Sequence, residues 1–223
     1  MLIQNNYANS FRIVEGTTEY YFKNTIFSVY APTKCGSTTM ARFMESSGIS
    51  EQNQYNALIN RHHANMRAEF VKAPNRVMVI RKPIERWKSG ILELAYYNLQ
   101  RDKEPYIEQD YKSFYTDHIG PIYSIQYDSD ELHIIHLSEL SKYTGVHMNS
   151  SIQSKRHYED LLNQMNVKKN PFVRILYERD KAWLSHEQAM YESMCDRFPV
   201  LSVGQWRSWV QESLDLEADD VHY

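Results

Sequence analysis

A loop rich in small and hydroxyl-bearing residues joins a short apolar run to a helical pattern near the N-terminus of the 223-residue chain. The stretch reads FSVYAPTKCGSTTMARFM over residues 27–44. Residues 25–30 are β-branched, aromatic or small, which predicts a buried strand. Apolar residues then recur at helical spacing as far as Gly48, which is placed to end the helix. This order constrains the fold most, because it predicts an α/β unit whose helix N-terminus can bind an anion.

The loop does not fit the Walker pattern of nucleotide triphosphate-binding proteins. In that pattern, G-x-x-x-x-G-K-[ST], the lysine follows the second glycine. Here Lys34 precedes Gly36, and the residue five positions before the glycine is Ala31. The loop can still bind an anion through unpaired helix amides, close backbone approach at the glycine, and hydroxyl donors. A structural reading also stays open, in which a hydroxyl residue only caps the helix and Lys34 is solvated.

A second unit of the same kind begins at residues 76–80, RVMVI, which predict another short strand. Pro83 falls near the first position of the helix that follows, where proline is favoured. Residues 131–137, ELHIIHL, predict a further strand in which the histidines are strand positions. Two strand-loop-helix units favour a parallel sheet with helices on its faces.

The C-terminal third of the chain is expected to be mostly helical. Apolar residues at helical spacing predict helices over residues 158–165, 180–198 and 203–214. The acidic end, from about residue 215, is expected to fray. The chain carries no repeat and no low-complexity linker, so residues 1–223 are expected to form one domain.

Composition excludes several classes of function. A net charge of −3 gives no bulk attraction to nucleic acid. With Cys35 and Cys195 as its two cysteines, the chain has neither a disulfide framework nor a four-cysteine zinc site, and its nine histidines show no metal-ligand spacing. No segment approaches the roughly 20 apolar residues that span a bilayer. We therefore expect a cytoplasmic protein without a metal, a membrane partner or a nucleic-acid partner.

Two motifs resemble those of a known enzyme family. PTKCGSTT, residues 32–39, resembles the 5'-phosphosulfate-binding loop of the sulfotransferases that use PAPS, 3'-phosphoadenosine 5'-phosphosulfate. RKPIERWKS, residues 81–89, resembles the family's 3'-phosphate motif, in which an arginine ends a strand and a serine follows eight residues later. The family's usual aspartate after that arginine is Lys82 here. Arg86 matches a position that is often arginine in the carbohydrate-type branch, although a structural ion-pair role is an equal alternative.

The resemblance covers about residues 27–97 and implies both a fold and an activity. The implied fold is the P-loop-like sulfotransferase fold, a three-layer α/β architecture with a central parallel sheet flanked by helices. The implied reaction moves a sulfuryl group from PAPS to a hydroxyl or amine acceptor, with a carbohydrate as one candidate, and needs no metal. The residues implied to bind PAPS are Lys34, Cys35, Gly36, Ser37, Thr38, Thr39, Arg81 and Ser89. Lys34 would also stabilise charge on the leaving phosphate oxygen.

An acceptor hydroxyl also needs a base, and histidine is the side chain most easily poised near neutral pH. His62 and His63 lie between the two motifs, where members of the family often carry their base. We favour His63 slightly and keep His62 and Glu69 as alternatives. A surface or packing role for either histidine also stays open. Lys155 and Arg156 loosely match a later family loop that closes over the nucleotide, but a solvated basic turn explains them better.

Two other functions remain open at this point. The chain could be a P-loop-like nucleotide kinase or hydrolase with an atypical loop, or a nucleotide-binding module without catalytic activity. The sequence leaves the acceptor and the oligomeric state undetermined.

Overall fold

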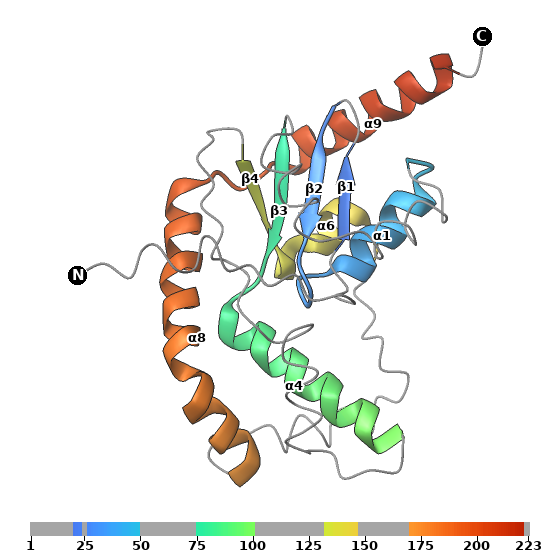
Figure 1. The fold of residues 1–223 in the computed structure, drawn as a ribbon. Coiled ribbons are helices and arrows are strands. Elements are labelled where there is room, and N and C mark those ends of the chain that lie inside the picture. Colours follow the sequence, from blue (N-terminus) through green and yellow to red (C-terminus); the bar gives the residue numbers. More distant parts are fainter. Residues whose placement is uncertain (1–19, 24–25, 50–74, 101–131, 147–169, 221–223) are drawn as a thin grey trace.

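The structure is a computed structural model that describes residues 20–23, 26–49, 75–100, 132–146 and 170–220. Its strands are β1 (Tyr20–Lys23), β2 (Ser28–Ala31), β3 (Arg76–Ile80) and β4 (Leu132–His136) (Figure 1). Its helices are α1 (Ser37–Ser46), α4 (Pro83–Gln100), the 3-10 helix η2 (Leu137–Glu139), α6 (Leu140–Thr144), α8 (Pro171–Arg197) and α9 (Val203–Asp220).

The strands form one small sheet in the order β1-β2-β3-β4. Strands β2, β3 and β4 are parallel, with Val29 opposite Val77 and Met78 opposite Ile134. The α/β class and the parallel pairing that the sequence predicts are therefore confirmed. Strand β1 runs antiparallel to β2 at the edge, so the sheet is mixed. This edge strand was not predicted from the sequence.

Helices cover both faces of the sheet. His133 packs against Trp209 of α9, with ring centroids 5.5 Å apart. The hydroxyl of Tyr191, in α8, lies 3.3 Å from Nδ1 of His136. Since side chains alternate along a strand, residues 133 and 136 point to opposite faces, and α9 and α8 cover opposite faces of β4. Every residue of β2 and β3 is buried, as expected for strands covered on both sides.

A second apolar cluster lies between α4 and α8, separate from the cluster around the sheet. Trp87 is completely buried there, and its indole N–H donates a 2.8 Å hydrogen bond to Oδ2 of the buried Asp180. Figure 1 shows α4 running beneath the sheet beside the first half of α8. The apolar members of this cluster from the two helices are Trp87, Ile91, Leu92, Leu94, Ala95, Val173, Leu176 and Leu184. The helical spacing predicted after Pro83 is thus confirmed.

Most predicted boundaries hold, and two are wrong. Helix α8 begins at Pro171 and not near residue 180, because Oδ1 of Asn170 accepts a 3.2 Å hydrogen bond from the amide of Val173 and caps the helix. Helix α9 continues to Asp220, six residues past its predicted end at residue 214. A 2.8 Å hydrogen bond from Gln211 to Asp215 links successive turns there. The predicted helix over 158–165 lies outside the described residues.

The end of α1 is as predicted. Gly48 has a left-handed φ of 76°, and its amide donates a 3.1 Å hydrogen bond to the carbonyl of Glu45. This left-handed glycine stops the helix and satisfies one of its last carbonyl groups.

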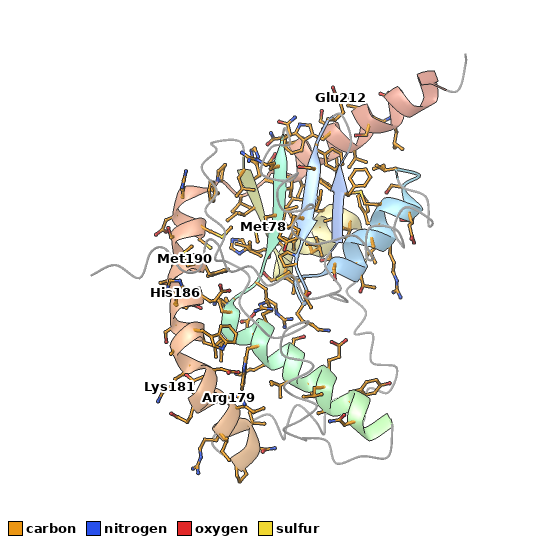
Figure 2. The ribbon with its side chains drawn as sticks, in the orientation of Figure 1. Met78, Arg179, Lys181, His186, Met190 and Glu212 are labelled. Atoms are coloured by element: carbon orange, nitrogen blue, oxygen red, sulfur yellow. The ribbon has the colours of Figure 1, made fainter. Side chains whose placement is uncertain are left out.

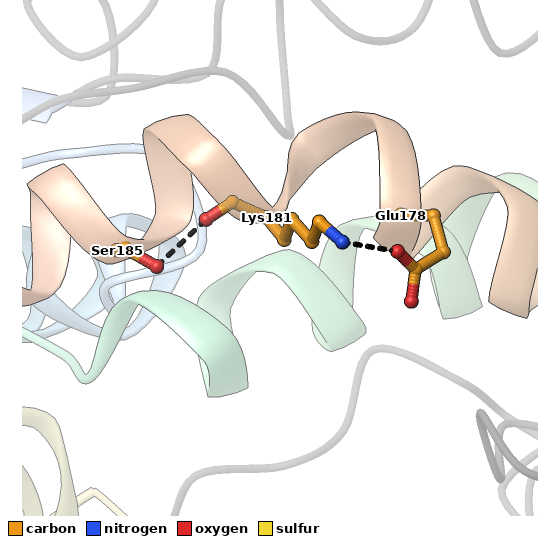
Figure 3. A network of polar contacts seen from close by, with 3 residues as sticks. All are labelled: Glu178, Lys181 and Ser185. Carbon is orange, nitrogen blue, oxygen red and sulfur yellow. Dashed lines mark hydrogen bonds and ion pairs between the residues drawn. The ribbon is translucent and has the colours of Figure 1, made fainter.

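Polar side chains occupy the outer face of α8. Lys181 pairs with Glu178, and Oγ of Ser185 donates a 2.8 Å hydrogen bond to the Lys181 carbonyl (Figure 3). In Figure 2, Met78 lies within the sheet, while Lys181 projects outward from α8. None of the described helices combines the length and the apolar character that crossing a bilayer requires.

Candidate functional site

The two sequence motifs meet at the carboxyl end of two parallel strands, β2 and β3. Strands β2 and β3 are adjacent and parallel, so the loops that follow them leave the sheet at the same end. Nη1 of Arg81, directly after β3, donates a 3.1 Å hydrogen bond to the carbonyl oxygen of Lys34, in the loop after β2. Residues 47 positions apart in the sequence are therefore in direct contact.

The loop after β2 adopts an unusual backbone conformation. Lys34 has a φ of 63° and Gly36 has a φ of 87°, both in the left-handed region. For a lysine this conformation costs roughly 1–2 kcal/mol, so packing and hydrogen bonds must hold it in place. The amide of Cys35 donates a 2.9 Å hydrogen bond to the carbonyl of Pro32, which closes a turn within the loop. Left-handed residues that are not glycine cluster at functional sites, which makes this turn a candidate.

Helix α1 starts at the end of this loop with Gly36 as its N-cap and no side-chain cap. The structural reading, in which a hydroxyl residue caps the helix, is therefore not the arrangement found. The first turn carries no acidic side chain, so its positive dipole end has no carboxylate of its own helix to offset it. Thr38 is exposed, Thr39 is half-buried and Ser37 is buried. These hydroxyls sit on the turn whose amides have no partners within the helix.

Gly36 and Cys35 both face the protein core. A Cβ atom built on Gly36 would lie 2.6 Å from Cδ2 of Leu140 and 2.7 Å from Cδ1 of Leu137. The space that the glycine leaves is thus filled by leucine side chains, in addition to the backbone requirement of its positive φ. The side chain of Cys35 is completely buried in the apolar cluster around the sheet. Packing therefore accounts for both residues, and a thiol buried in this way does not reach a ligand at the loop surface.

Thr33 adds a buried hydroxyl that the sequence analysis did not single out. The residue is 2% exposed, and its Oγ1 has no hydrogen-bond partner among the residues that the structure describes. A buried hydroxyl of this kind calls for a partner. Its place directly before Lys34 adds a polar group to the same turn.

Lys34 is held by a carboxylate from the second motif's helix. Its ammonium forms an ion pair with Oε2 of Glu93 in α4, and the two side chains are 15% and 18% exposed. Burial, followed by the guanidinium groups of Arg81 and Arg86, lowers the pKa of Lys34 from 10.5 to about 7. The carboxylate of Glu93 acts in the opposite sense, because it favours the charged ammonium. Lys34 is thus poised to change its charge close to neutral pH.

One face of α4 is directed at this loop. Arg86, Ser89 and Glu93 follow one another at helical spacings of three and four residues, which places them on the same side of the helix. Arg86 is 1% exposed and close enough to act on the pKa of Lys34. Ser89, half-buried, lies between the other two along this face. Glu93 was missed by the sequence analysis, although its position four residues after Ser89 was a usable signal.

The candidates for a catalytic base, His62, His63 and Glu69, lie outside the described residues, as do Lys155 and Arg156. His133 and His136 are strand residues of β4, as predicted. Among the residues that the structure describes, no three His, Cys, Asp or Glu side chains gather in a group that could hold a metal ion.

Comparisons with known proteins add no family to this picture. No family model, no curated protein and no solved structure matches the chain. The two motifs and the geometry in which they meet are therefore the basis for a proposed function.

Proposed function

We propose that this protein is a PAPS-dependent sulfotransferase with a P-loop-like sulfotransferase fold. It moves a sulfuryl group to a hydroxyl or amine acceptor, with a carbohydrate as one candidate. The observation that carries the proposal is the hydrogen bond from Arg81 to the carbonyl of Lys34, at the carboxyl end of two adjacent parallel strands. This contact supports a single site built from both phosphate motifs, because ligands of such sheets bind at that end of the strands.

The residues around the contact suit an anion with two separated charged groups. The loop and the first turn of α1 offer amides, hydroxyls and the ammonium of Lys34 to a 5'-phosphate. Arg81 offers a rigid donor fork, and Ser89 a hydroxyl, to a 3'-phosphate. Since Arg81 and Arg86 also lower the pKa of Lys34, positive charge is crowded at this point, and a polyanionic ligand would relieve the repulsion.

PAPS, when bound, supplies an activated sulfuryl group on its 5'-phosphate. Transfer breaks the bond between sulfur and the bridging phosphate oxygen and forms a bond from sulfur to the acceptor atom. In its ammonium form, Lys34 stabilises the charge that develops on the departing phosphate oxygen. A base takes the acceptor's proton, and His63, His62 and Glu69 remain the candidates for that role.

Calorimetry with adenosine 3',5'-bisphosphate tests the binding site, and labelled PAPS with a panel of glycans, phenols, alcohols and amines tests the transfer. We expect the bisphosphate to bind and to stabilise the protein thermally more than ATP with magnesium does. Stronger stabilisation by ATP with magnesium would support a kinase or hydrolase instead. Binding of the bisphosphate without transfer to any acceptor would point to a non-catalytic module, and failure to bind it would rule out the sulfotransferase.

A further inference from the structure

The contact between Lys34 and Glu93 joins the two strand-loop-helix units a second time, through side chains. Glu93 lies on the face of α4 that also carries Arg86 and Ser89, and its carboxylate reaches the ammonium of Lys34 in the loop after β2. We propose that Glu93 is a positioning residue for Lys34, which holds the ammonium at the mouth of the loop and keeps it charged. This role rests on the proposed function, in which Lys34 stabilises the leaving phosphate oxygen.

The charges around Lys34 explain why such a partner is needed. Among the described residues, the charged groups that act on the Lys34 ammonium are the guanidinium groups of Arg81 and Arg86 and the carboxylate of Glu93. Burial and both arginines favour the neutral amine. Glu93 alone of these groups favours the ammonium. Without it, Lys34 would lose its proton at a lower pH and would contribute less to the reaction at neutral pH.

The position of Glu93 also limits where the ammonium can lie. A lysine ammonium sits on a flexible stem of four carbons and is mobile unless a partner fixes it. Lys34 and Glu93 are both more than four-fifths buried, so their contact is shielded from solvent far better than a surface ion pair. The ammonium is thus directed toward the helix face that carries Ser89, between the two phosphate motifs.

The test compares wild type with Glu93→Gln and Glu93→Asp, with Glu85→Gln as the control. Glu85 is an exposed carboxylate on the same helix, so its substitution changes net charge equally. Competitive acylation of lysines, followed by mass spectrometry of the Lys34 peptide, measures the pKa of Lys34 without any need for activity. We expect the pKa of Lys34 to fall in Glu93→Gln, to fall less in Glu93→Asp, and to stay unchanged in Glu85→Gln.

The same variants have a kinetic signature. Because the ammonium form is required, kcat falls as pH rises through the pKa of Lys34. This fall is the descending limb of the profile of kcat against pH, and a lower pKa of Lys34 moves it to lower pH. For Glu93→Gln we expect a move of roughly one pH unit. The kcat near pH 8 would then fall about ten-fold, while kcat near pH 5.5 and the KM for PAPS change little. A residue with only a structural role would not move this limb.

The outcomes separate the two proposals. If wild type binds no bisphosphate and transfers nothing, the sulfotransferase proposal fails, and the acylation profiles alone decide whether Glu93 controls the charge of Lys34. Identical Lys34 profiles in wild type and Glu93→Gln would overturn the role of Glu93, whatever the activity. Should Glu93→Gln fail to fold, Glu93→Asp keeps the test decisive. Aspartate is one methylene group shorter, so its carboxylate lies farther from the ammonium, and the pKa of Lys34 must still fall in this variant.

Discussion

The two strand-loop-helix units of this protein share their order and differ in how they present polar groups. After β2, a turn with left-handed residues at Lys34 and Gly36 leads into a helix that has no side-chain cap. After β3, Arg81 and Lys82 lead directly to Pro83, and the polar groups are the side chain of Arg81 and side chains along the helix that follows. The first unit thus offers backbone amides, hydroxyls and one ammonium, and the second offers side chains alone.

This difference suggests a division of labour within the proposed site. In that site the bent backbone would bring amides close to one phosphate, whereas the side chains of Arg81, before α4, and Ser89, on it, would reach a second phosphate. The units contact each other through Arg81 and the carbonyl of Lys34. Changes at Lys34 in the first unit should therefore affect turnover, and changes at Arg81 in the second should affect binding of the nucleotide. Glu93, also in the second unit, should affect turnover through its contact with Lys34.

The largest expected effect is on turnover in Lys34→Ala. Removing the ammonium leaves the charge on the departing phosphate oxygen without its main partner, so kcat should fall about 10²–10³-fold, or roughly 3–4 kcal/mol. Steady-state kinetics with labelled PAPS measure this, and circular dichroism checks the fold. Lys88→Ala, which removes an exposed lysine from α4, is the control and should keep wild-type kcat. Normal turnover in Lys34→Ala would remove Lys34 from the mechanism.

Gly36→Ala should give the next largest effect, on stability. The new methyl group would combine a left-handed backbone with close approach to Leu137 and Leu140, and the free energy of unfolding should fall by about 2–3 kcal/mol. Urea denaturation measures the change.

Two control variants separate the causes of that loss. Gly145 has a φ of 64° and no atom within 4 Å of an added Cβ, so Gly145→Ala should lose only the backbone part, about 1 kcal/mol. Gly204 has neither feature and lies in α9, so Gly204→Ala should be neutral or slightly stabilising. Equal losses at positions 36 and 145 would show that the leucines yield to the methyl group.

Arg81→Ala should weaken binding of adenosine 3',5'-bisphosphate by about 30-fold, or roughly 2 kcal/mol, because a charge-assisted hydrogen bond is lost. Calorimetry measures the dissociation constant. Arg81→Lys keeps the charge but loses the donor fork, so it should fall between wild type and alanine. The neighbouring exposed Lys82, changed to alanine, is the control. A drop in kcat with unchanged affinity would contradict the division between the two units.

The smallest effect concerns the strained backbone at Lys34. Because glycine tolerates a positive φ, Lys34→Gly should be more stable than Lys34→Ala by about 0.5–1 kcal/mol, even though glycine has the more flexible unfolded chain. At Lys82, which has no positive φ, the order should be reversed. Thermal unfolding of the four variants measures both differences.

The sequence was most informative where one physical rule acts alone. Residues 77–80 are an unbroken apolar run between Arg76 and Arg81, and β3 has the predicted bounds of 76–80. Gly48 ends α1 because left-handed backbone favours glycine. Helix α8 shows where that logic stops. The apolar Ile175 in its first half is 63% exposed and interrupts the helical spacing of apolar residues, and the capping signal of Asn170 and Pro171 was not recognised.

The candidate site was predictable as two motifs but not as one set of contacts. That Lys34 and Arg81 come together depends on β2 and β3 being neighbours, which local patterns do not determine. Glu93 lies four residues beyond the matched motif, on the same helix face as Ser89, but its contact with Lys34 depends on how α4 lies against the loop after β2. The inward packing of Cys35 likewise depends on residues distant in sequence.

Helix α8, 27 residues long, contributes to both apolar clusters. Val173 and Leu176 in its first half pack against α4, and Tyr191 and Met194 in its second half pack around the sheet. A helix shared in this way transmits the loss of one cluster to the other, so the two should melt in a single cooperative transition. Amide hydrogen exchange along α8 should accordingly show one common opening free energy through its middle turns.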